Sequence, residues 1–177
     1  MIVTRDSFIR RCGLTEEFLR STEELYKVPG NLLLGLIRTE SRGMPGVMRY
    51  ERKYKWLHQP HLWAKKYGWT EETEEQLQKF SYGLAQLMGA TARDNGFDSH
   101  FFRLLEPTIG ASWGASHLFS LFKRYGSWDD AISAYNQGTP KRNRFTGRYR
   151  NQNYVDKVRQ AEREFNGAKS NGPTDSV

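Results

Sequence analysis

The chain has 177 residues, with 27 Lys plus Arg against 20 Asp plus Glu and a formal net charge of +7. A chain of this length buries roughly 70% of the surface that its unfolded form exposes, so one domain can build a proper core. The single cysteine, Cys12, excludes an internal disulfide. No apolar run approaches the ~20 residues of a membrane span. We therefore expect one soluble, basic domain without a transmembrane segment.

Helical patterns cover most of the sequence in chain order. Capping residues, apolar spacing and glycine or proline stops predict helical segments at 15–26, 31–42, 71–80, 84–94, 108–125, 128–136 and 154–165. Asn31 is the expected N-cap of the second segment. No strong β-hairpin pattern, fixed-period repeat or internal linker appears. The prediction is a mainly α single domain over residues 1–165, followed by a disordered tail at 166–177.

The segment 46–69 has no clean period. It places aromatic residues among Arg, Lys and His: Tyr50, Tyr54, Trp56, Trp63, Tyr67 and Trp69. We interpret it as loop and short helix lining a groove. Trp56, Trp63 and Trp69 are candidates for packing on sugar rings, and a core role for each is the alternative.

A carboxyl group ends the apolar face of the second helix. The residues at i, i+3, i+4 and i+7 are Leu33, Leu36, Ile37 and Glu40. Burial penalises the ionised form, so such a glutamic acid can stay protonated near neutral pH and act as a general acid. The alternative is a slightly rotated helix, which leaves Glu40 at the surface beside Arg38 or Arg42.

Other chemistries lack a signature. His58 and His61 are two residues apart, but no HExxH motif or suitably placed Cys12 completes a metal site. There is no GxSxG elbow and no GxxxxGK[ST] loop, so serine-hydrolase and nucleotide-phosphate chemistry are not indicated. We expect neither a metal nor a cofactor.

Four sequence blocks, taken together and in this order, resemble soluble lytic transglycosylases of the family 1 (SLT) type, which have a lysozyme-like fold. Residues 36–42 resemble the family's Glu-Ser helix end, and residues 81–92 resemble its Gly-Leu-Met-Gln block. Residues 131–138 resemble its Ala-Tyr-Asn-Ala-Gly block, and residues 153–158 resemble its Tyr-Val-x-Lys-Val helix. The resemblance covers roughly residues 31–161.

Several positions depart from the family pattern. Ala85 stands where Met is usual, which puts a substrate-packing contact in doubt, and Gly89 replaces a common Pro. Tyr82 takes the place often held by Ser, and Thr108 replaces a frequent Asn. In the long insertion, the Arg-Tyr-Glu triplet at 49–51 resembles phage-encoded members.

The resemblance implies cleavage of the β-1,4 bond between N-acetylmuramic acid and N-acetylglucosamine in peptidoglycan, with Glu40 as acid and then base and a 1,6-anhydro product. It implies substrate-binding roles for matched or neighbouring residues: Ser41, Ser81, Tyr82, Gln86, Tyr135, Asn136 and Tyr154. Structural alternatives stay open for some: backbone capping for Gln86, a turn for Asn136 and core packing for Tyr154. Two-carboxylate glycosidases need a second acid. Glu51 is the spare candidate, although a pair with a nearby base is favoured.

The basic stretch near the end of the chain contains no acid: Lys141, Arg142, Arg144, Arg148 and Arg150. It is either a solvated loop or a contact for a polyanion. The positive charge suits peptidoglycan, whose stem peptides and attached polymers are anionic. Nucleic acid is not the expected partner, because no helix gathers Lys and Arg on one face.

Two rival functions remain. One is a muramidase of similar fold that hydrolyses the same bond, and the other is an inactive virion structural or wall-binding component. The first residues lack the continuous apolar region of a signal peptide. We therefore expect a monomeric phage lysis or virion enzyme, passing from host cytoplasm to the periplasm and cell wall or carried with other virion proteins.

Overall fold

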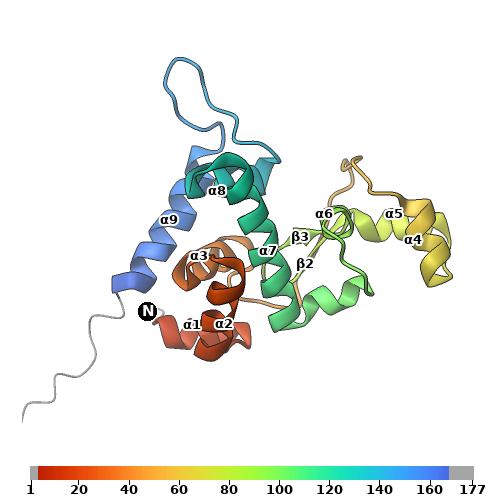
Figure 1. Ribbon diagram of the computed structural model, residues 1–177, viewed down its shortest axis with the longest axis horizontal. Helices are drawn as coiled ribbons and strands as arrows, with labels where there is room; N and C mark the ends of the chain where they lie inside the picture. Colours follow the sequence, from red (N-terminus) through yellow and green to blue (C-terminus); the bar gives the residue numbers. More distant parts are fainter. Residues whose placement is uncertain (1–3, 168–177) are drawn as a thin grey trace, which may run out of the picture.

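Helices dominate the computed structural model, which describes residues 4–167 (Figure 1). The helices are α1 (Arg5–Cys12), α2 (Glu16–Tyr26), α3 (Gly30–Ser41), α4 (Pro60–Tyr67), α5 (Glu71–Gln78), α6 (Gly89–Asp94), α7 (Pro107–Tyr125), α8 (Trp128–Gln137) and α9 (Gln152–Gly167), with a 3-10 turn at Phe101–Leu105. Three short strands complete the fold: β1 (Met48–Tyr50), β2 (Phe80–Tyr82) and β3 (Leu87–Met88). The mainly α class predicted from the sequence is confirmed.

Helix α3 lies at the centre of the larger lobe, with α1, α2, α7 and α9 around it (Figure 1). It is buried almost along its whole length. At Gly35 an added Cβ would lie 2.7 Å from the Val158 carbonyl oxygen, so the backbone of α9 packs directly on α3. The two helices run antiparallel, since the Asn31 side chain donates to Asn166 Oδ1 near one end and Glu40 meets Tyr154 at the other.

The smaller lobe is built on an antiparallel sheet of order β1-β2-β3. Helices α4, α5 and α6 lie on this side of the molecule, to the right in Figure 1. The turn between β2 and β3 has left-handed backbone at Gly83 (φ +66°) and at Gln86 (φ +47°). Gly83 is required there, because an added Cβ would lie 2.2 Å from the Leu104 carbonyl oxygen.

A buried ion pair organises this smaller lobe. Arg93 Nε lies 2.9 Å from Glu74 Oε1, and both side chains are 0% exposed. The guanidinium stacks over the rings of Trp63 and Phe101, at 4.4 and 4.0 Å from their centroids. Glu74 also accepts from the Trp69 indole at 3.1 Å. Trp63 and Trp69 are half-buried against this ion pair, whereas Trp56 is 69% exposed, and sugar binding by any of the three stays a prediction.

The structure differs from the sequence prediction in several elements. Helix α1 was not predicted, and Asn31 is not an N-cap, since α3 begins one residue earlier after Pro29. The predicted helix 84–94 is wrong over its first half, where the positive φ of Gln86 makes a turn and β3 follows. Strands of two or three residues are too short to produce a period that could be recognised.

The last helix extends slightly beyond its prediction. It runs from Gln152 to Gly167, so residues 166 and 167, placed in the tail by the sequence, are helical. The rest of the tail predicted to be disordered, 168–177, lies outside the described residues. Within residues 4–167, no helix has both the length and the apolar character to cross a membrane.

Candidate active site

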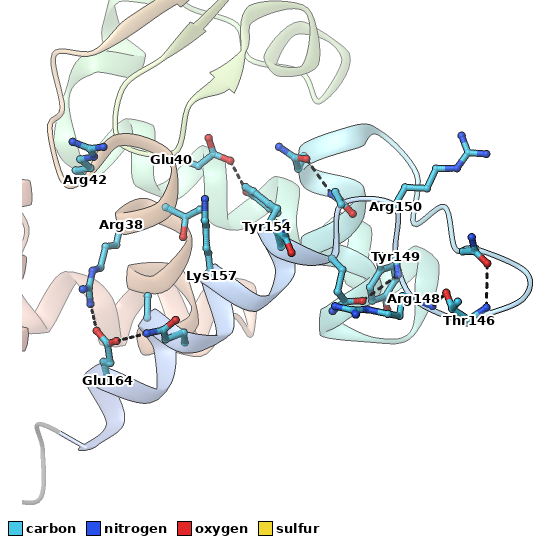
Figure 2. A pocket seen from close by; sticks show the side chains of 18 of the residues that line it. Arg38, Glu40, Arg42, Thr146, Arg148, Tyr149, Arg150, Tyr154, Lys157 and Glu164 are labelled. Carbon is cyan, nitrogen blue, oxygen red and sulfur yellow. Dashed lines mark hydrogen bonds and ion pairs between the residues drawn. The ribbon is translucent and has the colours of Figure 1, made fainter.

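A cleft of about 1170 Å³ opens at the end of α3. Its walls come from the last turn of α3, Arg49 of β1, the end of α8, the hairpin that joins α8 to α9, and one side of α9. Figure 2 shows Glu40 and Tyr154 near the middle of this cleft, with basic side chains on both sides. The antiparallel packing of α3 on α9 brings these two residues together across 114 positions of sequence.

Glu40 is the partly buried acid of the cleft, as its position at the end of the apolar face predicted. The Tyr154 hydroxyl donates a hydrogen bond to Glu40 Oε1. Loss of hydration raises the pKa of Glu40, while the Tyr154 hydrogen bond and the charge of Arg49 act in the opposite direction. The carboxyl group can thus hold a proton above its ordinary range and still be stabilised as an anion after releasing it.

Tyr154 itself stays a neutral donor. Burial first, then the neighbouring Glu40 charge, raises its pKa well above the ordinary value. A tyrosine in this state keeps its proton at neutral pH, so it can stabilise the Glu40 carboxylate without competing for the proton.

Tyr135 lies close to the same carboxyl group but bonds elsewhere. Its hydroxyl donates to the Ala85 carbonyl oxygen at 2.8 Å, and burial and the Glu40 charge raise its pKa. Gly114 of α7 makes this contact possible, since a Cβ there would lie 2.3 Å from the Ala85 Cβ. Tyr135 therefore joins α8 to the β2–β3 turn at the floor of the site.

Asn136 is exposed and lines the cleft. Its side-chain oxygen accepts from Asn151 Nδ2 at 3.0 Å, and the same nitrogen donates to the Ser133 carbonyl oxygen. Within residues 4–167, the amide nitrogen of Asn136 has no hydrogen-bond partner, which leaves it available to a ligand. Asn151, which orients Asn136, was not singled out from the sequence.

Gln86 and Ser81 bond to each other and to the protein. The Gln86 amide nitrogen donates to the carbonyl oxygens of Val47 and Gly83, at 3.0 and 2.9 Å. Its amide oxygen accepts from Ser81 Oγ at 2.9 Å. This is the backbone-capping role left open for Gln86. Substrate contact by either residue stays a prediction.

Ser41 and Tyr82 are both buried away from the cleft lining. Ser41 Oγ donates to the Ile37 carbonyl oxygen one turn earlier in α3, at 3.2 Å. Tyr82 is 0% exposed, and its hydroxyl donates to the Leu77 carbonyl oxygen at 2.7 Å. In this structure both hydroxyls bond to backbone carbonyl oxygens, and substrate contact by these residues stays a prediction.

The other carboxylates considered for the site are already paired with bases. Glu51 Oε1 accepts from Arg49 Nε at 2.5 Å, the pairing that the sequence favoured. Glu164, which also lines the cleft, forms an ion pair with Arg38 at 2.6 Å. Among residues 4–167, no group of three or more His, Cys, Asp or Glu side chains could hold a metal ion.

The comparison with protein families agrees with this geometry. The family described as Transglycosylase SLT domain matches residues 17–157, which include Glu40, Tyr135, Asn136 and Tyr154. This match spans well over half of the chain, so the chain belongs to the transglycosylase SLT family, whose fold is lysozyme-like and mainly α. Family membership implies lytic transglycosylase activity on peptidoglycan. No curated protein and no solved structure matches the chain.

Proposed function

We propose that this protein cleaves the N-acetylmuramic acid β-1,4 N-acetylglucosamine bond of peptidoglycan with Glu40 acting first as acid and then as base. The observation that carries the proposal is a carboxyl group with a raised pKa, hydrogen-bonded to the neutral Tyr154 in a large cleft. Family membership supplies the substrate class.

The chemistry needs no second carboxylate. Protonated Glu40 donates its proton to the glycosidic oxygen as the bond to C1 of the muramyl residue breaks, and N-acetylglucosamine leaves with a free 4-hydroxyl. The Glu40 carboxylate then takes the proton of the muramyl 6-hydroxyl, and that oxygen bonds to C1. The products are a 1,6-anhydro sugar and a regenerated acid, and no water is consumed.

The pairing of the other carboxylates supports a mechanism with one acid. An inverting or retaining glycosidase places a second carboxylate at a defined separation from the first. Here Glu51 and Glu164 each neutralise an arginine. The Tyr154 hydroxyl supports the acid step, because it stabilises the anion that forms when Glu40 releases its proton.

Mass spectrometry of the products tests the proposal. Purified peptidoglycan is digested with the wild type, with Glu40→Gln and with Glu51→Gln. We expect muropeptides one water lighter than hydrolytic products from the wild type and from Glu51→Gln, and none from Glu40→Gln. Reducing-end products would assign a muramidase that keeps Glu40 as its acid. Activity in Glu40→Gln would place the acid elsewhere, and no release by any of the three would favour an inactive wall-binding component.

A phage lysis or virion role is a further proposal. It is supported by the likeness of the Arg49–Glu51 triplet to phage-encoded members. Detection of this protein in purified virions, or in a lysate during phage growth, would support it, and its production by uninfected cells without a prophage would contradict it.

A further inference from the structure

The hairpin between α8 and α9, residues 138–151, is held by internal hydrogen bonds and projects from the body of the molecule (Figure 1). Its two arms are joined by backbone hydrogen bonds from Asn143 to Arg148 and from Arg150 to Lys141. Asn143 Oδ1 also accepts from two backbone amides at the tip. The backbone of the hairpin is therefore held in a defined conformation.

Basic residues around the cleft fall into two groups. Two that line it are neutralised by carboxylates: Arg38 by Glu164 and Arg49 by Glu51. Four exposed residues that line the cleft have no ion-pair partner within residues 4–167: Arg42, Arg148, Arg150 and Lys157. This second group gives the cleft an unbalanced positive charge.

The unpaired cations flank the acid. In Figure 2, Glu40 and Tyr154 lie between Arg42 on one side and Arg148 and Arg150 on the other. Arg148 and Arg150 lie on one arm of the hairpin, on either side of the buried Tyr149, and both line the cleft. Tyr149 anchors the arm, because its hydroxyl donates to Asp130 Oδ1 at 2.8 Å.

The cations and Glu40 line the same cleft, so a substrate whose cleaved bond lies at Glu40 brings its own nearest anionic groups within reach of those cations. The sugar rings themselves carry no charge. The muramyl residue carries a stem peptide on its 3-lactyl ether, and the free carboxylates of that peptide are the anions nearest to the cleaved bond. Positive charge concentrated in a cleft attracts such groups.

We propose that Arg148 and Arg150, with Arg42 and Lys157, bind carboxylates of the stem peptide, so that the protein selects glycan strands that still carry their peptides. This inference rests on the proposed function for its substrate class. It adds a subsite to the acid and tyrosine already described, and it assigns a role to the basic stretch that the sequence left as either a solvated loop or a polyanion contact.

A binding assay tests this subsite without turnover. Fluorescently labelled soluble glycan strands are titrated with Glu40→Gln protein, once with stem peptides and once after an amidase has removed them. The same titrations are made with Arg148→Gln/Arg150→Gln and with Lys141→Gln/Arg144→Gln, each in the Glu40→Gln background. The second pair lies on the same hairpin outside the cleft lining and removes the same net charge.

Stem-bearing strands should bind more tightly than stripped strands. An exposed ion pair changes an affinity by a factor of about 1.5 to 5, so removal of two should weaken binding of stem-bearing strands roughly 2- to 25-fold. Binding of stripped strands should not change, and Lys141→Gln/Arg144→Gln should match its parent on both. The preference should decrease with added salt.

Equal affinity for stem-bearing and stripped strands, or no binding to either, would overturn the subsite, and so would equal effects of the two double variants. Bound stem-bearing strands are also competed with free stem peptide and with a glycerol-phosphate polymer. Stronger competition by the polymer would overturn the subsite by assigning the cations to phosphate. The products of the wild type test the proposed function separately, so the two failures are distinguishable.

Discussion

Removal of one hydroxyl, by Tyr154→Phe, should move the pH dependence of catalysis upward. The Tyr154 hydroxyl donates to Glu40 Oε1 and so favours the carboxylate, which holds the pKa of Glu40 below the level that burial alone would set. Without it, Glu40 keeps its proton to higher pH. Since the first step needs protonated Glu40, kcat/KM falls as pH rises through this pKa, and that basic limb should shift to higher pH.

The size of the shift follows from the kind of hydrogen bond. A hydrogen bond to a charged group contributes about 1.5–3 kcal/mol, and one pH unit corresponds to 1.36 kcal/mol. Because the contact is only partly buried, the lower part of this range applies, which gives an upward shift of about 1 to 1.5 pH units. The ring of Phe keeps the packing of α9.

The assay is kcat/KM for soluble glycan strands measured between about pH 4 and pH 9. Tyr135→Phe is the matched control, because the Tyr135 hydroxyl bonds to the Ala85 carbonyl oxygen and not to Glu40. The basic limb of the kcat/KM profile of Tyr135→Phe should lie at the same pH as in the wild type, even if the value of kcat/KM changes. A limb that stays in place or moves down in Tyr154→Phe would refute the assigned direction of this hydrogen bond.

Three further predictions concern stability. Burial raises the pKa of Glu40 in the folded state above its value in the unfolded chain. The free energy of unfolding of the wild type should therefore fall, relative to Glu40→Gln, as pH rises from the unfolded-state pKa through the folded-state pKa. Each pH unit between the two pKa values corresponds to about 1.4 kcal/mol. Gly114→Ala should cost about 1–3 kcal/mol, because its Cβ would lie 2.3 Å from the Ala85 Cβ. Arg93→Met should cost about 3–5 kcal/mol, because it leaves Glu74 buried and unpaired.

Denaturant unfolding measures all three. A Glu40→Gln difference that is independent of pH would contradict the raised pKa. Gly46→Ala is the control for Gly114→Ala, since an added Cβ at Gly46 meets nothing within 4 Å. The double change Glu74→Gln/Arg93→Met should recover part of the loss seen with Arg93→Met, and an equal or larger loss would argue against an unpaired buried charge as the cause.

Local sequence located Glu40 only in part. It placed the carboxyl at i+7 of an apolar stripe, but a slightly rotated helix with Glu40 at the surface stayed open until the family resemblance favoured a catalytic role. Its contact with Tyr154 depends on how α3 crosses α9. No spacing within either segment encodes that crossing, so only resemblance to a family placed Tyr154 near the site.

The smaller lobe was harder to predict, because it is held together by charged and polar groups inside the core. Glu74 belongs to an acidic run that looks like a solvated helix face, and nothing in the local pattern pairs it with Arg93. Gln86 likewise satisfies three backbone and side-chain groups from residues up to 39 positions away. Such long-range pairings leave no periodic trace, so the sheet and the turn beside the cleft were missed.

The close packing of α9 on α3 has a consequence for the order in which the site forms. Glu40 is synthesised early, but the hydroxyl that bonds to it belongs to α9, the last described helix. The backbone of α9 packs directly on Gly35, so this contact needs the residues of α9 to be present. A ribosome-bound chain that ends before α9 carries the acid without Tyr154, Lys157 or the wall they supply. The proposed cleavage activity should therefore require the final segment to dock on α3.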